Sequence, residues 1–162
     1  GPDRQREKRA DLQVMPITFT NHLDTNVLSA LQELINAEFT QSVYYDTEYM
    51  QRGTNWFNLV PVADILEDNF SSSHTRAYEV LIQYYRIVPG DKRKSTHIAT
   101  VSAIMERLKR LIRSNSDYRV NGEQKFFNGT IANVNYQPEL EDVSSDVLLV
   151  EATFTANVFE VI

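Results

Sequence analysis

The residues of this chain that could carry out acid–base or metal chemistry are scattered. The three histidines are His22, His74 and His97, and no two of them stand at a spacing typical of a metal-binding motif. The chain has no cysteine, which excludes disulfides, thiolate metal sites and cysteine nucleophiles. It also has no phosphate-binding loop or nucleophile elbow. The sequence therefore predicts a protein that is not an enzyme and that binds no metal or cofactor.

Two groups of carboxylates could in principle bind a cation. The first is Asp64, Glu67 and Asp68, and the second is Glu139, Glu141 and Asp142. Neither group follows the pattern of ligand positions in a calcium-binding loop. We therefore expect both groups to lie in solvated loops.

A basic segment offers the clearest candidate for binding. Residues 92–119 contain eight Lys/Arg and two Asp/Glu, whereas residues 15–91 contain three and ten, and residues 120–162 contain one and seven. The candidate interface or docking residues in the basic segment are Lys92, Arg93, Lys94, Arg107, Arg110 and Arg113. Three interpretations are open: a solvated helix face, phosphate contacts with nucleic acid, or docking onto an acidic neighbour. Another copy of the chain could be that neighbour, and head-to-tail copies would then build a ring.

Two helices must position these residues. Apolar residues at helical spacing predict a first helix over residues 26–39. The second and longer helix is predicted over residues 96–113, where a stripe of seven apolar residues recurs at the same spacing. We expect Val101, Met105, Leu108 and Ile112 of this stripe to be buried against a sheet, and Ile98, Ile104 and Leu111 also belong to the stripe.

About five strands complete the expected fold. They are predicted over residues 42–50, 56–62, 76–88, 126–136 and 147–162, where β-branched and aromatic residues are frequent. The pattern of residues 64–69 does not indicate one type of secondary structure. Residues 71–73 and 137–146 are expected to be loops. Strands in succession, interrupted by one helix, are typical of an α+β fold with a small, mostly antiparallel sheet packed by two helices. No stretch is long and apolar enough to predict a membrane span.

The chain length suits one domain. We expect residues 15–162 to form it. Residues 1–14 begin with Gly-Pro and carry four Lys/Arg and three Asp/Glu. They are interpreted either as a leader left from expression or as a disordered basic arm.

The order of these elements resembles that of the tail-terminator and tail-completion (neck) proteins of long-tailed bacteriophages. The resemblance covers most of residues 17–162. It rests on the helix NVLSALQELINAEF, the strand WFNLVPV, the strand and helix RAYEVLIQYYRIV and STHIATVSAIMERLKRLIRSN, and the closing strands FFNGTIANVNY and VLLVEATFTANVFEVI.

The resemblance implies a structural virion protein, assembled in the bacterial cytoplasm, with no catalytic residues. Similar proteins form six-membered rings that cap the tail tube and join it to the head connector. The implied partners are other copies of the chain, the tail tube protein and the connector or neck proteins, with DNA only in transit. The alternatives are a head-completion or neck adaptor protein and a nucleic-acid-binding module that uses residues 92–113.

Overall fold

A computed structural model describes residues 15–88, 95–138 and 146–161. The first helical segment consists of a π-helical stretch, η1 (Leu23–Leu28), which runs directly into α2 (Ser29–Glu38). The long helix α3 spans Ser95–Ser114. The strands are β1 (Val43–Tyr44), β2 (Asn55–Asn69), β3 (Ser73–Ile87), β4 (Tyr118–Val120), β5 (Glu123–Asn135) and β6 (Val147–Val161). The predicted residues 1–14, and the greater part of the predicted loop 137–146, lie outside the described residues.

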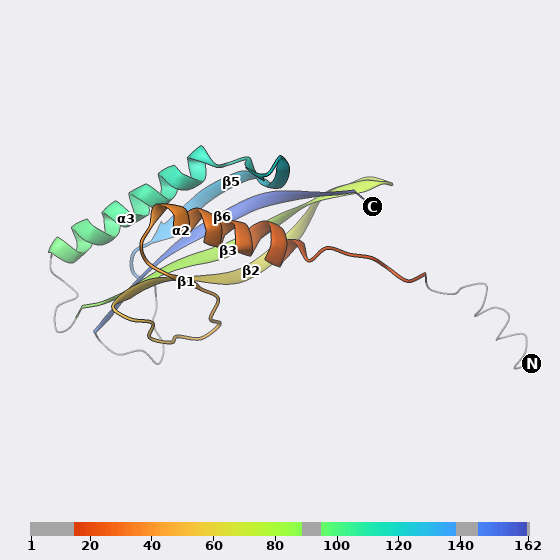
Figure 1. The fold of residues 1–162 in the computed structure, drawn as a ribbon. Helices are drawn as coiled ribbons and strands as arrows, with labels where there is room; N and C mark the ends of the chain where they lie inside the picture. The colour runs from red at the N-terminus through yellow and green to blue at the C-terminus, as the bar shows by residue number, and fades with distance from the viewer. Residues whose placement is uncertain (1–14, 89–94, 139–145, 162) are drawn as a thin grey trace, which may run out of the picture.

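The six strands of the described chain form one sheet in the order β1-β2-β3-β6-β5-β4. β1 pairs with β2 in parallel, and the other four neighbouring pairs are antiparallel. The long strands β3 and β6 pair without a register shift from Ser73↔Val161 to Ile87↔Val147. Both helices lie on the same face of this sheet (Figure 1).

The α+β class is confirmed, whereas the predicted sheet and the extent of its first strand are wrong. The sheet is mixed, because β1 pairs with β2 in parallel, and it has six strands, because three residues after α3 form the additional strand β4. The strand predicted over residues 42–50 is reduced to the two residues of β1. Residues 64–69, which matched no class, instead continue β2 to Asn69.

The helix α3 forms where its apolar stripe meets the sheet. Val101, Met105, Leu108 and Ile112 are buried, as predicted. They join one core with α2 and with the face of β3 that carries Tyr78, Val80, Ile82 and Tyr84. Ile98 is an exception, because its side chain is 60% exposed in the first part of the helix.

Among the described residues, a second, smaller apolar cluster covers one end of the opposite face of the sheet. It consists of Trp56, Tyr85, Val147 and Leu149. Tyr44 and Tyr49, from the segment that leads to β2, pack against it. The Trp56 and Tyr85 rings are stacked with centroids 5.1 Å apart.

At its other end the sheet extends beyond the helices. Every residue of β2 from Pro61 to Asn69 is exposed, whereas residues 56–59 are buried. We call residues 61–76, which comprise this half of β2, the following turn and the start of β3, the arm. The arm projects from the body of the protein beside the end of β6 (Figure 1).

Candidate interaction surface

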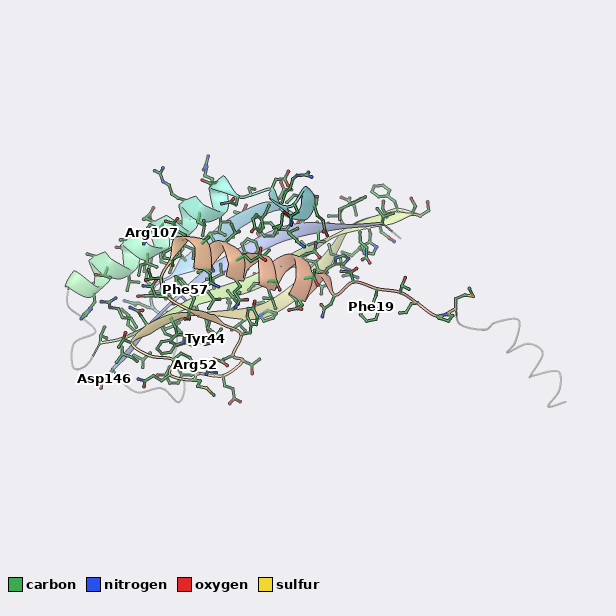
Figure 2. The ribbon with its side chains drawn as sticks, in the orientation of Figure 1. Phe19, Tyr44, Arg52, Phe57, Arg107 and Asp146 are labelled. Carbon is green, nitrogen blue, oxygen red and sulfur yellow. The ribbon has the colours of Figure 1, made fainter. Side chains whose placement is uncertain are left out.

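Arg107 is held by the end of the first helical segment. Its Nη2 donates to the backbone carbonyl of Glu38 at 2.8 Å and to Glu38 Oε1 at 3.0 Å. Its guanidinium also lies 4.5 Å from the centre of the Phe39 ring. Figure 2 shows Arg107 where α3 passes α2. Arg107 therefore joins two elements of the same chain, a role that the sequence did not predict.

Lys109 also has a partner within its own helix. Its ammonium group pairs with the carboxylate of Glu106, three residues earlier. The hydrogen bond to this carboxylate is the main cause that raises the pKa of Lys109. Two of the basic side chains in the second half of α3 are thus neutralised locally.

Arg110 and Arg113 differ from these two residues, because neither makes an ion pair within the described part of the chain. Arg113 and Lys109 line a hollow of about 380 Å³ between the end of α3 and β5, and Arg110 lines an adjoining hollow with them. We call this region the basic groove. Its lining residues are Glu106, Lys109, Arg110, Arg113, Ser114, Ser116, Gly129, Thr130 and Ile131, and the single carboxylate among them, Glu106, is paired with Lys109.

Glycine is required at position 129 in the wall of the groove. A Cβ atom there would lie 2.7 Å from Cε1 of Phe126, a core residue. The backbone N–H of Gly129 donates to the carbonyl of Ser116 at 2.9 Å, which fixes β5 against the segment after α3. The other three predicted docking residues, Lys92, Arg93 and Lys94, lie outside the described residues.

The arm exposes large apolar side chains. Ile65 and Phe70 are 62% and 63% exposed, and Val62 and Leu66 are also exposed. Phe159 and Val161, at the end of β6, add to this surface, because Phe159 pairs with Thr75 and Val161 with Ser73 of the arm strand β3. The arm therefore exposes apolar side chains that the described residues do not cover, with Ile65 on one face of the strand pair and Leu66 on the other, because successive strand residues point to opposite faces.

The segment before η1 contributes apolar side chains at the same end of the molecule. Met15, Ile17 and Phe19 are each more than three-quarters exposed. Phe19 and Thr20 line a hollow of about 300 Å³ together with Phe159 and Val161. Figure 2 shows Phe19 on the extended segment that leads to η1, and its side chain is exposed, in contrast to the buried Phe57.

Two histidines meet one carboxylate near the tip of the arm, where His74 pairs with Asn69 next to the turn. His74 Nε2 lies 2.9 Å from Glu160 Oε2, and His22 Nε2 lies 3.4 Å from Glu160 Oε1. The Nδ1 atom of His22 is 2.9 Å from Asn26 Oδ1. These contacts connect η1, β3 and β6. The sequence did not predict them, because the residues lie far apart in the chain.

The carboxylates of the arm have different surroundings. Asp64 Oδ1 accepts a hydrogen bond from Arg76 Nη1 at 2.7 Å. Glu67 and Asp68 have no ion pair within the described residues. The predicted solvated loop is therefore wrong for these three residues, since they lie in a strand.

The described residues contain no group suited to a metal ion and no helix suited to a membrane span. Across residues 15–88, 95–138 and 146–161, no group of three or more His, Asp or Glu residues is arranged to hold a metal ion. The carboxylates at positions 139, 141 and 142 lie outside these ranges. Neither helical segment of the described chain is long and apolar enough to cross a membrane.

Comparison with known proteins gives no family assignment. No family model and no curated protein matches the chain. One solved structure aligns with 90% of this chain and 97% of its own, with 13% identity and a TM-score of 0.42. Its name states no function, and a similarity of this size carries no argument about the present protein.

Proposed function

We propose that this chain is a structural protein that associates with copies of itself into a ring. In this proposal the ring caps a phage tail tube and joins it to the head connector, as the resemblance of its element order implies. The observation that supports self-association is the arm, with its four exposed apolar side chains Val62, Ile65, Leu66 and Phe70.

Exposed apolar surface of this kind favours a binding partner. Single apolar side chains on a surface are ordinary, but a contiguous group is typical of an interaction site. Burial of apolar surface contributes about 25 cal/mol per Å², so covering the arm stabilises an assembly. Phe159 and Val161, at the end of β6, add two exposed apolar side chains on the face of the sheet that carries Ile65.

The free edge of the arm disfavours open-ended strand pairing. Pro61 lacks a backbone donor, and the register of β2 against β3 shifts between Pro61 and Ala63 and again between Leu66 and Asp68. Proline, bulges and charged residues at a sheet edge oppose edge-to-edge aggregation. The arm is therefore suited to a specific side-chain contact.

The distribution of charge supports contact between two different surfaces. Arg110 and Arg113 lie on α3, whereas Glu67 and Asp68 lie on the arm. A contact between different patches on successive copies generates a ring when the rotation closes. This arrangement is the one that a tail terminator requires.

Two rival functions predict different results. A head-completion or neck adaptor protein would also form a ring, but it would bind the head connector and not a tail tube. A nucleic-acid-binding module would use residues 92–113 as phosphate contacts. The pairing of Arg107 with Glu38 and of Lys109 with Glu106 reduces the charge available for that role.

Negative-stain electron microscopy of the full purified chain tests the proposal. We expect closed rings of uniform diameter with a central opening, and binding of these rings to the ends of purified tail tubes. Particles of the size of one chain at every concentration would contradict the proposal. Rings that bind connectors and never tubes would favour the neck adaptor.

A further inference from the structure

We propose that the arm of one copy binds in the basic groove of the next copy. This inference rests on the proposed function and deepens it, because it identifies the two surfaces that form the ring contact. The arm supplies apolar side chains flanked by carboxylates, and the groove supplies arginines beside an apolar wall.

The arm carries carboxylates that are available for ion pairs with another copy. Asp64 is already engaged by Arg76, but Glu67 and Asp68 have no ion pair within the part of the chain that is described. They stand between Leu66 and Phe70, whose side chains are 43% and 63% exposed. A matching surface must therefore offer both positive charge and an apolar recess.

The basic groove meets both requirements. Arg110 and Arg113 have no carboxylate partner in the described chain. Ile131, on β5, adds an apolar wall to the groove. The hollow that Arg113 and Ile131 line has a volume of about 380 Å³, near the lower end of the range of about 300–1,000 Å³ typical of ligand pockets. It is sufficient for one large side chain such as that of Phe70.

Contact between the arms of two copies is less favourable than contact between an arm and a groove. A symmetric contact would bring Glu67 and Asp68 close to their own counterparts, and like charges in an interface oppose binding. The arm also cannot fold back onto its own groove, because β3 pairs with β6 from Ser73 to Ile87 without interruption. The complementary surface is therefore on another copy.

Charge reversal on each surface tests the pairing. The variant Glu67→Arg/Asp68→Arg makes the arm basic, and Arg110→Glu/Arg113→Glu makes the groove acidic. We expect each variant alone to weaken self-association at least about tenfold, because like charges then meet at the contact. Glu48→Arg is the control, since Glu48 is exposed in the segment before β2, away from both surfaces.

Recombination of the two changes gives the decisive result. An equimolar mixture of the two variants places a basic arm on an acidic groove and an acidic arm on a basic groove, so assembly should return. A single chain with all four substitutions should also assemble. Analytical ultracentrifugation measures the association, and Trp56 fluorescence reports whether each variant retains its fold.

The outcomes separate the inference from the proposed function. A wild-type chain that stays monomeric overturns the proposed function and the inference with it. A wild-type oligomer that both reversed variants retain overturns the inference alone. Dissociation of both variants without recovery in the mixture or in the fourfold variant also overturns the pairing of arm and groove.

Discussion

The guanidinium of Arg107 covers the ring of Phe39 at 4.5 Å from its centre. The two residues come from α3 and from the position just after α2, so this contact joins the helical segments that share one face of the sheet. The same side chain donates to Glu38. A residue that the sequence presents as a docking candidate thus has a role within the fold.

Replacing Arg107 with alanine should destabilise the folded chain by about 0.5–2 kcal/mol. An exposed ion pair contributes about 0–1 kcal/mol, and an exposed cation–π contact contributes about 0.5–1 kcal/mol. Urea denaturation followed by Trp56 fluorescence measures the change. Arg119→Ala is the matched control, because Arg119 has a longer contact of 3.5 Å with Asp117 and should lose less than about 0.5 kcal/mol.

Leu108→Ala should cost about 2–5 kcal/mol, since the side chain is fully buried under the sheet and its removal leaves a cavity. Ile98→Ala, in the same helix, should change the stability by less than about 0.5 kcal/mol because Ile98 is 60% exposed. Equal effects from the two substitutions would show that the placement of α3 on the sheet is wrong. Chemical denaturation at one fixed protein concentration compares them.

Asn58→Ala should cost about 1–3 kcal/mol and loosen the segment before β2. The buried amide accepts from the Asp46 backbone N–H at 2.6 Å and donates to the Asp46 carbonyl at 2.8 Å and to Gln83 Oε1 at 2.9 Å. Loss of this side chain leaves those groups without their partner. We expect faster proteolysis between residues 45 and 54, whereas Asn133→Ala on the exposed part of β5 should cause no change.

Tyr85 should make stability depend on pH in the alkaline range. Burial, with repulsion from Glu151 as a smaller cause, raises the pKa of Tyr85 from 10.0 to about 12. Because folding opposes ionisation of this phenol, its contribution is complete below pH 10 and is lost as the pH rises through about 12. Between pH 9 and pH 12, the free energy of unfolding should decrease less steeply with pH for Tyr85→Phe than for the unchanged chain, as measured by chemical denaturation at each pH. The same decrease of unfolding free energy with pH in both proteins would contradict the raised pKa of Tyr85.

The sequence predicts those parts of the fold in which one face is buried and the other is exposed. The α3 stripe has the helical period, and the apolar residues of β3 and β6 alternate, so their buried faces could be assigned. Val150, Ala152, Phe154, Ala156 and Val158 of β6 are buried on one face, whereas Leu148 on the same face is half-buried. These periods are visible in the sequence because each of these elements buries one face in a single core and exposes the other.

The same reasoning failed where a segment has no buried face. The distal half of β2 is exposed along its whole length, so no alternation distinguishes Ile65 and Leu66 from loop residues. β4 has three residues, too few for a period. The contacts of Arg107 with Glu38 and of His22 with Glu160 depend on tertiary packing, which sequence spacing does not encode.

The central claim is that copies of this chain bind one another to form a closed assembly. Native mass spectrometry of the full chain at several concentrations tests this claim most directly. We predict one dominant closed oligomer, six copies if the resemblance to tail terminators holds, whose stoichiometry does not increase with concentration. A monomer that persists at the highest concentration measured, or an open-ended series of oligomers, would contradict the account.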